Sequence, residues 1–366
     1  MPVIERNPRL AAPDQLVAFG YDERVAALAA VHAAGLMLGR VIRADRGFTF
    51  VATGEGIVMA RPATRLIKAA GDGGLPVAGD WVGVGGDESE PLVEEVLPRV
   101  TAIERRDPGR ATRVQVLAAN VDFVLVTHAL ADAPNLARIE RELALVWDSG
   151  ALPVVVLTKA DLSEDPAAAR DQAQSVAPGV LVHVTSAASG EGIEELRHYL
   201  EGHRTIVLIG PSGSGKSTLI NVLAGADIQD TREVRVSDGR GRHTTVAREL
   251  IVLPDGGLVI DTPGLRAVGM WDSLEGLDQA FSDVAGLAEE CRFADCLHLS
   301  EPGCAVIAAV EAGDLPERRL ESYRELQAEI RHVTDQRDVR MREEKKRADK
   351  QLARSIKRFY RSKGTS

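Results

Sequence analysis

The 366-residue chain is 45% hydrophobic and 27% charged, a composition that supports two or three domains with buried cores and excludes a disordered chain. No apolar run approaches the roughly 18 residues of a membrane span, and the initial stretch MPVIERNPRLAAPDQLVAFG holds no apolar segment of signal-peptide length. We therefore expect a cytoplasmic protein that does not enter a membrane.

The formal charge of −10 is distributed unevenly along the chain. Residues 337–366 hold 12 of the 44 Lys and Arg but only 4 of the 54 Asp and Glu, so this tail carries +8 and the rest of the chain −18. A solvated helix would account for such a tail, but an acidic protein also needs a local basic surface to approach RNA. We favour RNA binding for the tail.

Residues 35–97 have the pattern of short β-strands. Apolar and polar residues partly alternate in GLMLGRVIRA, FTFVATG, GIVMARPATRLI, DWVGVGG and PLVEEVLPR, and turn residues separate these stretches. The pattern predicts a β-barrel of the oligonucleotide-binding (OB) type in a domain of residues 35–103, with a generic β-sandwich as the alternative. Residues 1–34 are interpreted as an N-terminal extension.

The middle of the chain, residues 104–275, has the pattern of an α/β domain. The apolar stretches VDFVLVTHAL, LPVVVLTKADL, VLVHVTSA, TIVLIG and GLVIDTPG alternate with helical or loop segments. Residues 276–366 are predicted to form a helical third domain that ends in a basic helix. Within it, Asp314 and Pro316 mark the start of a helix. The apolar face of that helix consists of Leu320, Tyr323, Leu326, Ile330 and Val333.

The stretch VLIGPSGSGKSTLINVL contains the G-x-x-x-x-G-K-S sequence of a phosphate loop, with an apolar strand before it and a helix after it. In such a loop backbone N–H groups approach the phosphates, Lys216 reaches the β- and γ-phosphate oxygens, and the Ser217 hydroxyl binds Mg²⁺. The candidate nucleotide-binding residues of this loop are Gly210, Pro211, Ser212, Gly213, Ser214, Gly215, Lys216, Ser217 and Thr218.

Two downstream motifs add further parts of a nucleotide hydrolase. Asp261 in VIDTPG can hold Mg²⁺ through water, and the N–H of Gly264 can meet the γ-phosphate. The polar loop GRGRHTT, between this motif and the phosphate loop, offers Thr244 or Thr245 as a further Mg²⁺ ligand.

The water-positioning residue differs from that of Ras-type GTPases. There a glutamine follows Asp-x-x-Gly, whereas here Leu265 occupies that position and cannot orient water. The nearest candidate in sequence is His243, for which a solvent-facing loop histidine is the alternative.

The base-reading element precedes the phosphate loop. Thr158, Lys159 and Asp161 follow an apolar strand with the spacing of the Asn-Lys-x-Asp motif, in which the aspartate accepts hydrogen bonds from N1–H and the 2-amino group of guanine. Ser186 and Ala187 follow the next strand and resemble the loop whose backbone N–H meets guanine O6. Because Thr158 stands in place of Asn, guanine selectivity is expected to rest mainly on Asp161.

All three cysteines lie in CRFADCLHLSEPGC, with the spacing C-x₄-C-x-H-x₅-C. The thiolates of Cys291, Cys296 and Cys304 and the imidazole of His298 suit a closed tetrahedral zinc site. Four protein ligands fill the coordination shell, so this zinc should be structural. An odd cysteine count in a cytosolic protein argues against a disulfide framework.

Taken together, the order of these motifs resembles a circularly permuted GTPase. The barrel before it and the Cys/His cluster after it resemble the family of ribosome small-subunit-dependent GTPases, from about residue 35 to the end. The motifs that carry the resemblance are AANVDFVLV, GPSGSGKSTLIN, GRGRHTT, DTPG and the cysteines.

This resemblance implies a multi-domain α/β protein with an OB-type barrel, a permuted P-loop GTPase domain and a C-terminal zinc-binding helical domain. It implies a monomer that binds GTP or GDP with Mg²⁺, one structural Zn²⁺, the 30S subunit and its 16S rRNA. We expect the protein alone to hydrolyse GTP slowly and the 30S subunit to stimulate this hydrolysis during late subunit maturation. The alternatives are a P-loop ATPase or kinase, and an RNA-binding module with GTP as a structural ligand.

Overall fold

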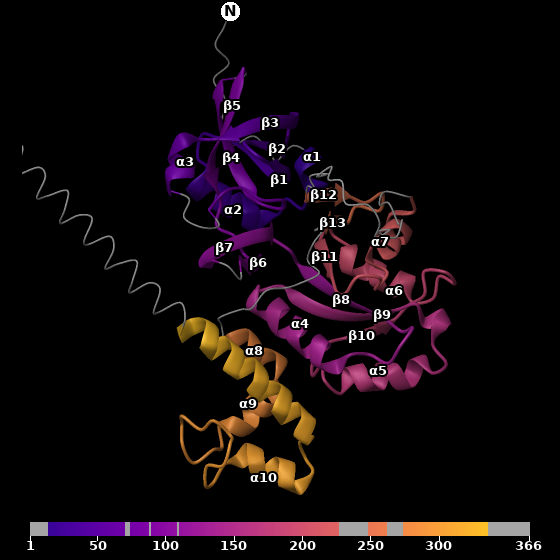
Figure 1. The fold of residues 1–366 in the computed structure, drawn as a ribbon. Coiled ribbons are helices and arrows are strands. Elements are labelled where there is room, and N and C mark those ends of the chain that lie inside the picture. Colours follow the sequence, from indigo (N-terminus) through magenta and orange to yellow (C-terminus); the bar gives the residue numbers. More distant parts are fainter. Residues whose placement is uncertain are drawn as a thin grey trace, which may run out of the picture.

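The computed structural model describes residues 14–69, 74–87, 89–107, 110–226, 248–261 and 274–335. The barrel, the α/β sheet and the C-terminal helices follow one another from top to bottom of Figure 1. Within these described ranges, no helix combines the length and the apolar character that crossing a membrane requires.

A closed barrel of five strands forms the N-terminal part. The strand order is β1-β2-β3-β5-β4, and pairing of β4 with β1 closes the barrel, which confirms the predicted OB-type architecture. Its strands are β1 (Met37–Asp45), β2 (Phe48–Thr53), β3 (Gly56–Pro62), β4 (Trp81–Asp87) and β5 (Glu90–Val96). The end of the predicted third strand is instead the helix α3 (Thr64–Ala69), which connects β3 to β4.

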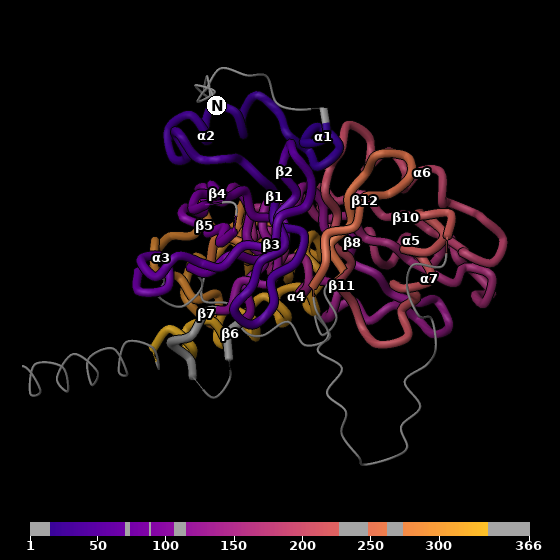
Figure 2. The backbone as a smooth tube through the Cα atoms, turned by 90° about the horizontal axis from the view of Figure 1, so that it is seen from above, coloured from indigo at the N-terminus to yellow at the C-terminus, as the bar shows by residue number. Residues whose placement is uncertain are grey.

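Two helices in the predicted N-terminal extension belong to the barrel's packing. These are α1 (Asp14–Val17) and α2 (Glu23–His32), and Asp22 caps the second by accepting from the N–H of Val25. Leu16 and Val25 are buried in one cluster with Trp81 of the barrel. Figure 2 shows both helices along one side of the barrel strands. Sequence reasoning missed these helices because α1 has only four residues and the alanine-rich α2 has weak periodicity.

The α/β sheet continues from the barrel. Its parallel strands have the order β10-β9-β8-β11-β13, the antiparallel β12 follows, and the pairing of Arg43 with Glu249 joins β12 to β1. The strands are β8 (Phe123–Ala129), β9 (Leu152–Thr158), β10 (Val182–Val184), β11 (Thr205–Ile209), β12 (Glu249–Val252) and β13 (Leu258–Asp261). A separate antiparallel pair, β6 (Ala102–Asp107) and β7 (Arg110–Ala119), lies between barrel and sheet in sequence.

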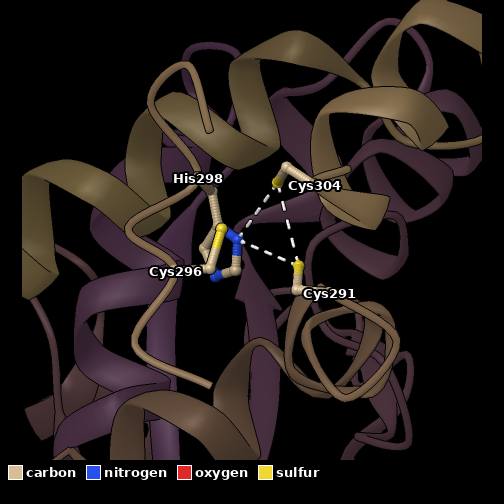
Figure 3. A group of neighbouring side chains, drawn as sticks. All are labelled: Cys291, Cys296, His298 and Cys304. Atoms are coloured by element: carbon tan, nitrogen blue, oxygen red, sulfur yellow. Dashed lines mark hydrogen bonds between the residues drawn. The ribbon is translucent and has the colours of Figure 1, made fainter. Parts of the chain in front are cut away.

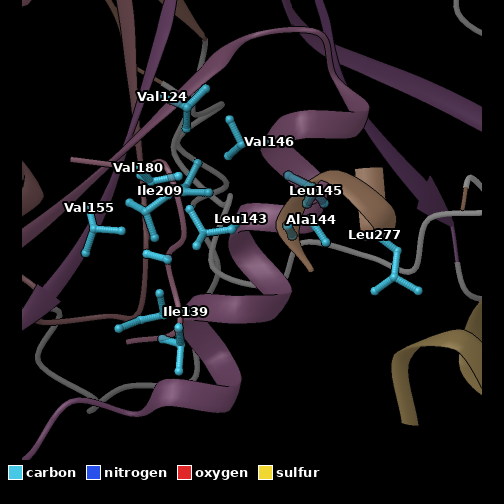
Figure 4. Packing of buried hydrophobic residues seen from close by; sticks show 14 of the residues in the cluster. Val124, Ile139, Leu143, Ala144, Leu145, Val146, Val155, Val180, Ile209 and Leu277 are labelled. Carbon is cyan, nitrogen blue, oxygen red and sulfur yellow. The ribbon is translucent and has the colours of Figure 1, made fainter. Parts of the chain in front are cut away.

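Helices cover both faces of this sheet because successive strand residues point to opposite sides. In β8, Val124 and Val126 face one buried cluster and Leu125 faces the other. Figure 4 shows part of the first cluster, with Val124 opposite residues of α4. The helices α4 (Leu136–Asp148) and α5 (Pro166–Gln174) contribute to the first cluster, and α6 (Ile193–Arg197) and α7 (Lys216–Ala224) to the second. Two 3₁₀ turns, η1 (Ala160–Leu162) and η2 (His198–Leu200), follow β9 and α6.

The C-terminal part is helical and shares its core with the α/β sheet. It contains α8 (Glu275–Ala280), α9 (Ser282–Ala288), α10 (Ala305–Ala312) and a helix over residues 317–335. The predicted apolar face of this last helix is confirmed, since all five of its residues are buried. Leu277 and Phe281 belong to the same buried cluster as Leu143 of α4, so the α/β sheet and the C-terminal helices pack as one unit.

Candidate nucleotide-binding site and metal centre

The predicted phosphate loop connects β11 to α7 at the carboxyl edge of the sheet. Gly210 and Gly215 have positive φ angles, of 138° and 84°. A Cβ on Gly210 would lie 2.2 Å from the carbonyl oxygen of Thr127, so only glycine allows the loop to leave the sheet here. Ser212, Gly213 and Thr218 are exposed, which opens the loop toward solvent.

The Lys216 ammonium lies against the loop itself. It donates to the carbonyl oxygens of Gly210 at 2.9 Å and Pro211 at 2.7 Å, and it lies 3.3 Å from the Ser214 hydroxyl. Ser214 is almost fully buried, unlike its neighbours in the loop. The carbonyl oxygens of the loop therefore hold the Lys216 ammonium in place, and phosphate oxygens that entered the loop would contact it there.

The candidate base-reading residues lie next to this loop. The Thr158 hydroxyl donates to the carbonyl oxygen of Ser214 at 2.7 Å, so its single hydrogen is used on the phosphate loop rather than on a base. Lys159 has a φ of 58°, and this left-handed residue turns the chain into η1, which contains Asp161. The Ser186 hydroxyl donates to a carboxylate oxygen of Asp161, so the structure brings both base-reading segments together.

The structure describes some of the remaining candidate residues for Mg²⁺ and phosphate binding, and others lie outside the described ranges. Ser217 lies in the first turn of α7, and Asp261 ends β13, the neighbour of β11. The predicted Mg²⁺ ligand Thr244 or Thr245, the γ-phosphate contact Gly264 and the candidate His243 lie outside the described residues, as does the basic tail.

The second candidate site is the predicted metal centre. One ligand atom from each of Cys291, Cys296, His298 and Cys304 lies within 4.8 Å of the others (Figure 3). The sulfurs of Cys291 and Cys304 are 3.8 Å apart, and Nδ1 of His298 lies 3.4 Å from the Cys304 sulfur. Tetrahedral zinc with Zn–S bonds of about 2.3 Å separates two sulfurs by about 3.8 Å, so this donor set fits a zinc ion.

A glutamate organises the loop that presents this centre. Glu301 accepts hydrogen bonds from the N–H groups of Leu297, Leu299 and Ser300, at 2.8 to 3.0 Å. Hydrogen bonds from its own N–H and from these neighbouring backbone groups lower the pKa of Glu301 to about 2. Burial lowers the pKa of His298, which favours the neutral imidazole that a metal requires.

Sequence reasoning missed two residues that shape these sites. Thr127 is fully buried near the end of β8, and its hydroxyl lies 2.8 Å from the Ser214 hydroxyl. A polar residue at the end of the apolar run VDFVLV was the available signal for Thr127. Glu301 had none, because its partners are backbone groups.

The structure places a phosphate loop at the carboxyl edge of a parallel sheet, with an OB-type barrel before it in the chain and a Cys₃His cluster after it. The candidate base-reading strand precedes the phosphate loop in sequence. This combination defines a circularly permuted P-loop GTPase. The sequence model of the RsgA GTPase family matches residues 96–271, and a second one, described as 50S ribosome-binding GTPase, matches residues 205–360. The chain belongs to the RsgA GTPase family and is a GTP hydrolase.

Curated relatives and solved structures agree with this membership. The small ribosomal subunit biogenesis GTPase RsgA of Streptomyces coelicolor is 48% identical over 333 residues, 90% of each chain, and that of Syntrophotalea carbinolica is 42% identical over 338 residues, 90% of this chain and 93% of that one. The structure of YjeQ from Thermotoga maritima has a TM-score of 0.61 at 28% identity and covers 80% of this chain and 98% of its own. YloQ, described as a circularly permuted GTPase, has a TM-score of 0.58 at 27% identity and covers 82% of this chain and 97% of its own. These similarities do not favour the alternative of an ATPase or kinase.

Proposed function

We propose that this protein binds the small ribosomal subunit and hydrolyses GTP during the late biogenesis of that subunit, with its nucleotide state controlling the contact. The observation that carries the proposal is similarity to small-subunit biogenesis GTPases over nine tenths of each chain. Such a role corresponds to a cytoplasmic monomer that leaves the subunit after hydrolysis.

Guanine recognition is assigned to the segments around Asp161 and Ser186. A carboxylate at Asp161 accepts from N1–H and the 2-amino group of guanine, a pair of donors that adenine lacks. The hydrogen bond from Ser186 to Asp161 supports this role because it fixes the carboxylate beside the loop of Ser186 and Ala187. Thr158 joins these segments to the phosphate loop by donating to the carbonyl oxygen of Ser214. Lys159 turns the chain into the 3₁₀ turn that contains Asp161.

The phosphates are assigned to the loop of residues 210–218. Its backbone N–H groups and Lys216 bind and orient them, with the start of α7 directed at negative charge. Mg²⁺, which the GTPase family implies, neutralises phosphate charge when bound; Ser217 and Asp261 would hold it together with Thr244 or Thr245. Gly264 remains the predicted contact to the γ-phosphate.

The Cys₃His cluster is assigned to one structural zinc ion. All four ligands come from the protein, and Cys304 also caps α10 by accepting from the N–H of Ile307 at 3.4 Å. The metal would therefore fix a loop to a helix rather than activate a substrate.

Contact with 16S rRNA is assigned to the barrel and to the basic tail. On the barrel, Arg43 lies 4.4 Å from the ring centre of Phe50, and Arg61 lies 5.0 Å from that of Phe48. Ile57 and Met59 are exposed beside them on β3. Paired cations and aromatic rings on an OB surface suit phosphate contact and base stacking.

Co-sedimentation with purified 30S subunits tests the proposal in three states: a non-hydrolysable GTP analogue, GDP, and no nucleotide. We expect retention with the analogue and release with GDP, because the γ-phosphate contacts should order the subunit-binding form. Equal binding in all three states would refute nucleotide control. Competition by ATP as strong as by GTP would support an ATPase or kinase, and bound GTP that is never turned over would support a purely structural ligand.

A further inference from the structure

Ser214 is the point in the phosphate loop where two neighbouring strands are attached. Its carbonyl oxygen accepts from the Thr158 hydroxyl of β9 at 2.7 Å, and its hydroxyl lies 2.8 Å from that of Thr127 in β8. Both threonines are buried, and Ser214 is 1% exposed. A polar loop residue held by two buried hydroxyls has little freedom to rotate.

The direction of the hydrogen bonds in this network follows from counting hydrogens. The Thr127 hydroxyl donates its one hydrogen to the carbonyl oxygen of Ile209 at 2.8 Å, so in its contact with Ser214 it accepts. The Ser214 hydroxyl therefore donates to Thr127 and turns a lone pair toward the Lys216 ammonium, 3.3 Å away. Hydrogen bonds run in one direction from Lys216 through Ser214 and Thr127 to β11, an arrangement in which each bond polarises the next.

We infer that Thr127 is a positioning residue for the phosphate loop, acting through Ser214 on the Lys216 ammonium and thereby raising affinity for the β- and γ-phosphates. Without the Thr127 hydroxyl, the Ser214 hydroxyl is free to rotate and donate its hydrogen to a loop carbonyl, and the ammonium loses an acceptor of fixed orientation. This inference rests on the proposed assignment of residues 210–218 to the phosphates.

The test compares nucleotide affinities of Thr127→Val, which keeps the shape and removes the hydroxyl, with those of Thr127→Ser, which restores it. We expect T127V to weaken GDP and GTP-analogue binding about tenfold and T127S to bind like the unmodified protein. Because Thr127 acts through Ser214, S214A should show a similar loss, and the double variant T127V/S214A should bind no more weakly than S214A. A matched control is Thr205→Val, which removes a buried hydroxyl at the opposite end of β11, where it accepts from Arg40. T205V should lower the melting temperature and leave nucleotide affinity unchanged.

Two outcomes would overturn the inference: unchanged affinity in T127V, or losses from the two single variants that multiply in the double variant. Should T127V fail to fold, S214A carries the test, since it keeps the bond from Thr127 to Ile209; normal affinity in S214A would then reject the inference. If the unmodified protein bound no guanine nucleotide, the proposed assignment of the site would be wrong instead.

Discussion

At the scale of single residues, Glu301 shows how a partly exposed carboxylate can organise a metal site without binding the metal. Its two oxygens accept from the N–H groups around His298, a residue with a left-handed φ of 57°. That backbone conformation is uncommon for a residue with a side chain, so these hydrogen bonds offset its cost. Glu301 therefore orients the imidazole toward the sulfurs.

Replacing Glu301 with Gln should weaken zinc binding about tenfold, the low end of the range for residues that orient metal ligands. The pKa of Glu301 is about 2 in the folded protein, below its usual 4.5. Its stabilising effect is therefore fully present above pH 4.5 and is lost only as the pH falls toward 2. Competition with a chelating dye should give the same ratio between the two proteins from pH 6 to pH 8. A ratio that changes across this range would contradict the role assigned to this carboxylate.

At the scale of elements, a buried ion cluster fastens the last helix to α4. The guanidinium of Arg319 donates to Glu140 at 2.8 Å and to Asp283 at 2.9 Å, and it lies 3.9 Å from the ring centre of Phe281. Glu140 is fully buried and also accepts from Arg318 and Ser322. These contacts join the GTPase sheet, through α4, to the helices that surround the metal centre.

Replacing Glu140 with Gln should lower the free energy of unfolding by about 3 kcal/mol, because it leaves the buried Arg319 charge without its closest carboxylate. Glu329 offers a matched control, since it accepts from Arg141 of the same helix α4 at 2.6 Å but both side chains are partly exposed. E329Q should cost less than about 1 kcal/mol. Urea unfolding of the two variants measures the difference; equal losses would show that burial does not decide the strength of this attachment.

The elements that the sequence predicted best are those whose pattern lies within one short stretch of the chain. The apolar runs identify the buried parallel strands β8, β9 and β11, and the spacing of the cysteines predicts the Cys₃His cluster that the structure brings together. The fully buried Glu140 was not predicted, because its partners lie more than 170 residues away and its sequence context, RIERELALVWD, is that of an ordinary helix. The contact between Thr158 and Ser214 also depends on the sheet order, which the sequence of motifs alone does not contain.

At the scale of the whole molecule, the GTPase sheet is attached to the barrel as well as to the C-terminal helices. Arg40 of β1 is buried and donates to the carbonyl oxygens of Gly79 and Asn120 and to the Thr205 hydroxyl of β11. Burial lowers the pKa of Arg40 to about 10, so it remains charged at neutral pH. The barrel surface proposed to touch RNA is thus attached to the sheet that carries the nucleotide site.

Such an attachment means that docking through the barrel presents the sheet and its phosphate loop to the subunit in a fixed orientation. If the loop containing His243 is ordered there, a water-positioning group enters a site in which Leu265 cannot act. We therefore expect slow hydrolysis by the protein alone, near 10⁻⁴ s⁻¹ in order of magnitude, and an acceleration of at least about 10²-fold by 30S subunits.

His243→Ala should lose most of this acceleration while its affinity for GTP stays normal. The control is His198→Ala, which removes an exposed histidine at the start of η2 and should remain fully stimulated. Single-turnover phosphate release, with and without 30S, separates the chemical step from nucleotide binding. Full stimulation of the His243 variant would show that another residue positions the water. Equal hydrolysis rates with and without subunits would contradict the proposal that docking orders a water-positioning residue.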